Sequence, residues 1–495
     1  MAIDRTPNWL AWVVLALLLL PLWLSSWLPT TDFTNHLARC WILSKLPADS
    51  FWAEHYQIDS WIASNRGMDL LVTPLLSRIS PEIVGRLMMS LIVVLHWAGV
   101  RLLARQAGTM GWLTLVPLFF VHNSIYYMGF VNYCLSAALA VLVVSIWVGP
   151  AVHSWNWFTA VSLLVLGAAT YLSHLGGTFC MTMAAAFCGA FDLWRRQWTR
   201  WKLLYYSLPF LPAAVLYLGW PPQAPDPVPV KWDNITSKLL KSMSLFTGYD
   251  YQLDAIVVAL FVAGAFLAWR AGLEWEPRLA GLGLLFSLLF AVFPFTLASG
   301  SDAYTRFIIP AGIFLGTAAR IRPPGRGWQA AVILLLGAMV LKMALLTGSW
   351  MELGKEARKQ IELLDRVEPH SILLPLVYSP PSIAQQKRER FVSNLPAAVV
   401  YRRDALMVTT FAAKGQHPIL LRKPFGLRPG VDDTFGWGRV PPEYFNHPEL
   451  IDFRHVFATM DYLYTWRLPE SLQHRVLEYG TLIGETGHGR LYRRR

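Results

Sequence analysis

The sequence is poor in charge, in cysteine and in soluble-enzyme motifs. Only 15% of its 495 residues are charged, against roughly 25% in an average soluble domain, whereas 55% are hydrophobic. The motifs G-x-x-x-x-G-K-[ST], G-x-S-x-G and H-E-x-x-H are absent, which excludes ATP-driven transport, a serine hydrolase and a zincin protease. The four cysteines show neither a disulfide framework nor a zinc spacing: Cys40, Cys134, Cys180 and Cys188. Together these absences exclude a soluble globular enzyme.

Long apolar runs are what the sequence has instead. Runs of about 17 to 22 residues are long enough to cross a bilayer as helices. The first run has no small-residue cleavage site, so it is predicted to be an uncleaved membrane helix. We therefore expect a mainly α, polytopic membrane helix bundle with about 11 spans, near residues 9–28, 82–104, 111–126, 130–149, 157–173, 175–192, 203–220, 252–270, 279–297, 304–320 and 328–348.

Basic residues predict the orientation of these spans. Alternate short loops are rich in Lys and Arg, as expected of cytoplasmic loops: Arg101/Arg105, Arg195/Arg196/Arg200/Lys202, Arg270/Arg278 and Arg320/Arg322/Arg326. This pattern places the N-terminus in the cytoplasm and the first long loop, 29–81, outside, together with the C-terminal tail. Lys231, Lys238 and Lys241 depart from the pattern, because they lie in a predicted outer loop. They form either a solvated face or contacts to an anionic ligand.

The density of charge changes near residue 349. Residues 1–349 hold 22 Lys or Arg and 15 Asp or Glu, whereas the much shorter segment 350–495 holds 21 and 16. The change predicts a membrane domain, 1–349, and a C-terminal extracytoplasmic small α/β domain, 350–495. Strands are predicted at 371–377, 397–401, 462–466 and 490–492, and helices at 351–367 and 468–479. Residues 379–450 resist assignment.

The first outer loop carries the strongest candidates for chemistry. Leu37, Trp41 and Leu46 recur at helical spacing, which predicts a helix on the outer membrane surface. In that helix Asp32, His36 and Arg39 share one face, because they are four and three residues apart. A carboxylate there can take a proton from a hydroxyl group, or Asp32 can simply cap the helix.

Further polar residues are predicted at the same membrane face. Asp69 is a second candidate acid, with capping of a helix near Met68 as the alternative. Asn132 and His174 lie at the outer ends of spans, where polar residues are functional candidates. Arg306 can bind a phosphate through two parallel hydrogen bonds; alternatively it extends to the membrane interface and pairs with Asp302.

Several short motifs resemble those of the GT-C superfamily of integral membrane glycosyltransferases. They are an Asp just after the first membrane helix in a long first outer loop, the segment Asn65-Arg-Gly-Met-Asp69, the segment Met128-Gly-Phe-Val-Asn-Tyr133 and the segment Arg306-Phe-Ile-Ile-Pro310. The resemblance covers nearly the whole chain, including the external tail. Many relatives carry paired acids in the first loop, whereas Phe33 and Thr34 follow Asp32 here. A divalent metal is therefore possible, but no paired-acid motif supports it.

The resemblance implies transfer of a sugar from a polyprenyl-phosphate-linked donor to a lipid or glycan acceptor at the outer face of the bacterial inner membrane, with no nucleic acid involved. It implies Asp32 as the catalytic base, and substrate binding by His36, Arg39, Asp69, Asn132, His174 and Arg306. Two alternatives stay open. A transporter or flippase of a lipid-linked saccharide would place polar residues at mid-membrane depth, and an O-antigen ligase or polymerase would place its long loop between late spans.

Overall fold

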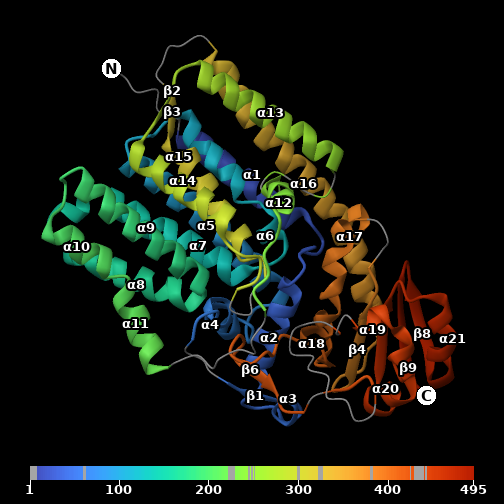
Figure 1. Cartoon of the computed structure of the whole chain (residues 1–495). Coiled ribbons are helices and arrows are strands. Elements are labelled where there is room, and N and C mark those ends of the chain that lie inside the picture. Colours follow the sequence, from blue (N-terminus) through green and yellow to red (C-terminus); the bar gives the residue numbers. More distant parts are fainter. Residues whose placement is uncertain are drawn as a thin grey trace.

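The structure is a computed structural model that describes residues 8–59, 63–220, 229–243, 246, 249, 251–297, 301–321, 327–379, 383–423, 425–428, 440 and 443–495. A bundle of apolar helices forms its larger part, and a sheet with covering helices lies at one corner (Figure 1). Within the described residues, five helices are long and apolar enough to cross a membrane by length and composition: α5 (Pro81–Gln106), α7 (Val131–Val148), α9 (Leu175–Trp194), α13 (Tyr251–Arg270) and α16 (Trp328–Leu364).

Three shorter apolar helices match predicted spans, namely α1 (Asn8–Leu24), α8 (Trp157–Ser173) and α14 (Pro277–Val292). The mainly α bundle followed by a small sheet is thus confirmed, while the count of 11 spans stays a prediction. The short strands β2 (Leu273–Trp275) and β3 (Ala319–Ile321), which are far apart in the sequence, pair antiparallel at one end of the bundle (Figure 1).

Proline interrupts the remaining three predicted spans. The span at 111–126 is a 3-10 helix, η2 (Trp112–Phe120), followed by α6 (Ser124–Tyr127), and it contains Pro117. Pro209 separates α10 (Arg200–Ser207) from α11 (Phe210–Gly219). The span at 304–320 divides into η5 (Tyr304–Phe307) and α15 (Ile308–Ala318), with Pro310 in the first turn of α15. A proline lacks the backbone N–H that a continuous α-helix requires.

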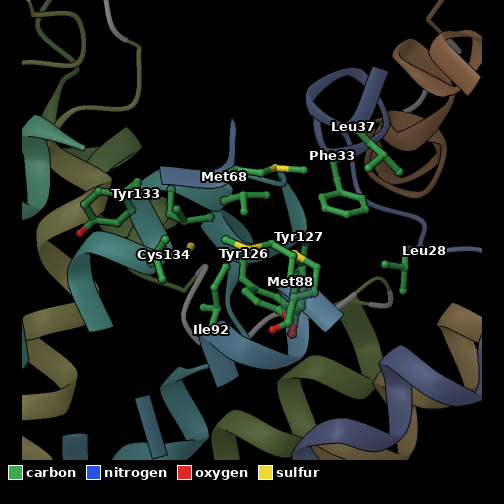
Figure 2. Close-up of a cluster of buried hydrophobic side chains, with 14 of the residues drawn as sticks. Leu28, Phe33, Leu37, Met68, Met88, Ile92, Tyr126, Tyr127, Tyr133 and Cys134 are labelled. Atoms are coloured by element: carbon green, nitrogen blue, oxygen red, sulfur yellow. The ribbon is translucent and has the colours of Figure 1, made fainter. Parts of the chain in front are cut away.

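The described part of the predicted first outer loop folds into helices that the rest of the chain covers. They are α2 (Phe33–Lys45), α3 (Ser50–His55) and α4 (Gly67–Val72), with the strand β1 (Tyr56–Ile58) and the turn η1 (Thr73–Leu75). Phe33 and Leu37 of α2 belong to the same buried cluster as Met68, Tyr126 and Tyr127 (Figure 2). Helix α2 is buried within the protein, so its apolar side packs against the chain itself, while its position at the outer membrane surface stays a prediction.

The tail contains a five-stranded sheet with the order β5-β4-β7-β9-β8. Strand β4 (Ile372–Val377) runs parallel to β5 (Leu406–Met407) and β7 (Tyr462–Trp466), and β9 (Gly489–Arg494) runs antiparallel to β7 and β8 (Gly480–Thr486). The strands predicted at 371–377, 462–466 and 490–492 are confirmed, whereas β8 was not predicted. The helices around the sheet are α17 (Ile383–Glu389), α18 (Ala398–Arg403), α19 (Glu443–Asn446), α20 (Phe453–Thr459) and α21 (Glu470–Tyr479).

The strand predicted at 397–401 is wrong, because these residues are helical. The turn η7 (Leu395–Ala397) leads directly into α18. Pro396 sits in the first turn, where its fixed backbone angle favours a helix. An apolar run of five residues does not separate a buried strand from a buried helix.

The tail and the bundle are joined through backbone and side-chain contacts. Helix α16 is continuous across the boundary predicted at residue 349. In addition, β6 (Ile419–Leu421) of the tail pairs antiparallel with β1 of the first loop, and the Trp41 indole N–H donates to Asp404 over 2.8 Å. The compositional boundary thus falls inside one helix, and the tail covers the first loop.

Candidate functional site

Backbone contacts fix Asp32 at the start of α2. The N–H groups of Thr31 and Asp32 donate to the carbonyls of Tyr127 and Met128 over 3.1 and 2.9 Å. The neighbouring Gly129 has φ of +78°, and a Cβ there would lie 2.7 Å from the Phe33 nitrogen. This close approach requires glycine.

The Asp32 carboxylate is not used to cap α2. Asp32 occupies the N-cap position, yet it makes no side-chain capping hydrogen bond. Instead, its Oδ1 atom accepts a hydrogen bond of 3.0 Å from Nδ2 of Asn394 in the tail. This side-chain contact reaches Asp32 from a residue 362 positions away. No sequence motif indicated Asn394, which lies in the segment 379–450 that resisted assignment.

Arg39 and Asp69 form a buried ion pair. Nε and Nη2 of Arg39 donate to the two carboxylate oxygens of Asp69, each over 2.8 Å. Both side chains have no exposed surface. The pair joins α2 to α4, and it turns the guanidinium toward Asp69. The predicted second acid thus meets the predicted cation, and neither contact involves Asp32.

His36 lies in an aromatic cluster between the first loop and the tail. Its ring meets Phe411 edge-on with centroids 4.9 Å apart, and Phe411 stacks on His417. Burial, followed by the charge of Arg39, lowers the pKa of His36 well below its usual 6.5. Burial likewise lowers the pKa of His417, with further contributions from Arg39, His36 and Arg66. Both histidines are therefore neutral at pH 7.

Asn132 fastens the segment 65–68 to α7. Its Oδ1 accepts from the Met68 N–H over 2.7 Å, and its Nδ2 donates to the carbonyl and to Oδ1 of Asn65, over 3.0 and 2.9 Å. Asn65 itself has a positive φ of 68°. Both ends of the Asn132 amide are thus engaged within the protein.

His174 and Arg306 bring two hydrogen-bond donors together. Nη1 of Arg306 lies 3.2 Å from Nε2 of His174, while Nδ1 of His174 accepts the Gly176 N–H over 2.8 Å. A neutral imidazole accepts at one nitrogen only. Since Nδ1 accepts, the proton is on Nε2, and two N–H groups face each other. Such a pair is stabilised by an acceptor that both can reach, and an anionic oxygen is the strongest.

Arg306 has no acidic partner among the residues that the structure describes. Asp302, the alternative partner, pairs with Lys241 over 3.2 Å instead. The Arg306 guanidinium lies 5.4 Å from the centre of the Phe130 ring and 5.5 Å from that of Tyr133. Phe130 directly follows Gly129, so one short loop contacts both Asp32 and Arg306.

A small apolar cavity lies between α7, α9, α14 and α15, and neither Arg306 nor His174 lines it. Ile309 and Pro310, which follow Arg306 within one turn, line it. Ala137 of α7, one turn after Tyr133, lines the opposite side. Its remaining lining is also apolar and includes Val141, Ala184, Phe286 and Phe314.

Two of the three lysines in the predicted outer loop contact other parts of the protein. Lys238 in α12 (Ile235–Ser242) is 5% exposed, and its ammonium donates to the carbonyls of Ala291 and Phe293. Lys241 pairs with both Asp233 and Asp302. The expected solvated face is therefore wrong for these two residues, whereas Lys231 is exposed.

No metal-ligand cluster occurs in the described part of the chain, since no three or more His, Cys, Asp or Glu side chains gather there.

Comparisons with known proteins give one informative result. No protein-family model and no curated protein matches the sequence. The crystal structure of ArnT from Cupriavidus metallidurans bound to undecaprenyl phosphate matches with a TM-score of 0.52. The match covers 98% of both chains at 12% sequence identity. The chain has the fold of ArnT. The resemblance to GT-C glycosyltransferases is confirmed at the level of the fold, from the helix bundle through to the tail.

Proposed function

We propose that this protein is a membrane glycosyltransferase that moves a sugar from a polyprenyl-phosphate-linked donor to a lipid or glycan acceptor. The observation that carries the proposal is the pair of His174 and Arg306, whose N–H groups meet without an acidic partner among the described residues. The phosphate of a polyprenyl phosphate supplies an anionic oxygen that both N–H groups can reach. The shared fold supports this choice, because ArnT was crystallised with undecaprenyl phosphate.

In the proposed reaction, Asp32 acts on the acceptor, and Arg306 and His174 act on the leaving phosphate. The acceptor hydroxyl attacks the anomeric carbon, and Asp32 takes its proton as general base. The bond from that carbon to the phosphate oxygen breaks, and the lipid phosphate leaves with the bonding electrons. Arg306 and His174 stabilise its negative charge, because their donors already converge before the reaction.

The other predicted binding residues fit a supporting role better. Arg39 and Asp69 pair with each other, and Asn132 holds the segment 65–68. Neutral His36 packs against Phe411. Direct substrate contact by these four residues stays a prediction, and so does the placement of the site at the outer face of the bacterial inner membrane with the tail in the periplasm.

The test uses purified protein in proteoliposomes with radiolabelled undecaprenyl-phosphate hexoses and pentoses and a native lipid extract as acceptor. Release of undecaprenyl phosphate and transfer of label are both measured. We expect Asp32→Asn to lower turnover more than 100-fold, whereas Glu54→Gln, an exposed acid of the same loop, leaves it unchanged. Folded Asp32→Asn protein with wild-type turnover would contradict the role of Asp32, and no release from any donor by wild type would contradict the proposal.

A further inference from the structure

Two buried asparagines connect the tail to Asp32. Asn35 lies in the first turn of α2, and Asn394 lies between η6 (Arg390–Ser393) and η7 of the tail. Asn35 is fully buried, and Asn394 is 5% exposed. Because buried amides are costly without hydrogen-bond partners, the direction in which each amide points is informative.

The tail backbone fixes the amide of Asn35. The Phe411 N–H donates to its Oδ1 over 2.8 Å, and its Nδ2 donates to the Thr409 carbonyl over 3.1 Å. A backbone N–H can only donate and a carbonyl can only accept. The two ends of the Asn35 amide are therefore not interchangeable.

The fixed orientation of the Asn35 amide determines the orientation of the Asn394 amide, which in turn contacts Asp32. Nδ2 of Asn35 also donates to Oδ1 of Asn394 over 2.9 Å. The oxygen of Asn394 must face Asn35, so its Nδ2 faces the other way and donates to Oδ1 of Asp32 over 3.0 Å. Rotating either amide by 180° would bring two donors or two acceptors together.

We propose that Asn394 is a positioning residue for the reaction and that Asn35 sets its direction. The inference rests on the proposed function, in which Asp32 is the base. A donor to one carboxylate oxygen favours the ionised form and fixes the plane of the carboxylate. The tail, which the sequence predicts to be a separate domain, thereby completes the site in the membrane bundle.

The test separates turnover from binding. Asn394→Asp keeps the shape and the acceptor for Asn35, but it replaces the amide donor with a second carboxyl group about 3 Å from Asp32. Two carboxylates this close retain a proton between them, so the variant removes the neutral donor and also opposes the ionised form of Asp32. We expect kcat to fall about 10- to 100-fold, the scale of a misplaced catalytic group, while the affinity for undecaprenyl phosphate changes less than twofold. Ser393→Ala, its exposed neighbour, serves as the matched control and keeps wild-type kcat.

A second variant keeps the inference testable if Asn394→Asp does not fold. Asn35→Asp retains the acceptor for the Phe411 N–H and loses the donor that orients Asn394, so a smaller fall in kcat is expected. Wild-type kcat in either folded variant overturns the inference alone, provided that Asp32→Asn is inactive. Loss of folded protein in both variants shows a merely structural role and also overturns it. An active Asp32→Asn protein overturns the proposed base and this inference together.

Discussion

At the scale of single residues, Gly129 leaves the space that the backbone at Asp32 and Phe33 occupies. Gly129→Ala puts a methyl group 2.7 Å from the Phe33 nitrogen at a φ of +78°, so Asp32 must move. We expect about 1–3 kcal/mol of lost stability and at least a tenfold fall in turnover. Gly108→Ala is the matched control, because Gly108 has a φ of +67° but nothing within 4 Å. Equal turnover in the two variants would contradict this account.

The neutral histidines predict a dependence of stability on pH. Because burial lowers the pKa of His36 and His417, the unfolded chain binds more protons than the folded chain below pH 6.5. Stability should therefore fall as the pH drops below 6.5, by up to about 1.4 kcal/mol per pH unit for each histidine. Thermal unfolding from pH 7 to 5 should show a shallower decline in His36→Gln and His417→Gln, but not in the exposed His447→Gln. An unchanged decline in both buried variants would contradict the prediction.

Site residues could be predicted where the signal lies in the adjacent sequence. Asp32 follows the end of the first apolar run, and Arg306 opens a late one, so both are visible from position alone. Asn35 and Asn394 are not, because they meet across 359 residues and carry no motif. The ion pair of Arg39 with Asp69 was likewise hidden, since helix periodicity relates Arg39 only to neighbours within α2.

At the scale of elements, a buried charge cluster holds three helix ends together. Asp192 of α9 binds Arg278 of α14 over 2.6 Å and Lys202 of α10 over 3.0 Å, and it accepts from the Tyr206 hydroxyl. Asp192→Asn leaves two buried cations with a neutral partner, at a cost of about 3–5 kcal/mol.

The matched control for the Asp192 cluster is Glu274→Gln. Glu274 pairs with Arg320 at the surface, where both side chains are partly exposed, and such pairs contribute about 0–1 kcal/mol. Thermal unfolding in detergent should therefore separate the two variants clearly. A similar loss of stability in both would show that Asp192 is not a central contact.

Helices and strands could be predicted from the sequence where an apolar run is either long or short and bounded by polar turns. Helices such as α5 and α7 follow from apolar length, and β4 and β7 from short apolar runs between polar turns. The prediction was wrong at 397–401, where five apolar residues and Pro396 form a helix. The three spans that proline divides were predicted as continuous helices, because apolar composition does not take into account the backbone N–H that proline lacks.

At the scale of the whole molecule, the tail and the bundle are joined by several contacts. Helix α16 runs through the predicted boundary, β6 pairs with β1, and Asn394 reaches Asp32. The change in charge density near residue 349 predicts where the chain leaves the lipid and enters water. It does not indicate which surfaces then pack together, because that depends on contacts between distant residues.

The central claim is that Arg306 and His174 bind the phosphate of a polyprenyl phosphate. The most direct test is native mass spectrometry of the purified protein with undecaprenyl phosphate. The account predicts saturable binding of one lipid to wild type and to Asp32→Asn, at least tenfold weaker binding to Arg306→Ala, and wild-type binding to Lys231→Ala. Equal binding to wild type and Arg306→Ala, or no saturable binding to wild type, would contradict it.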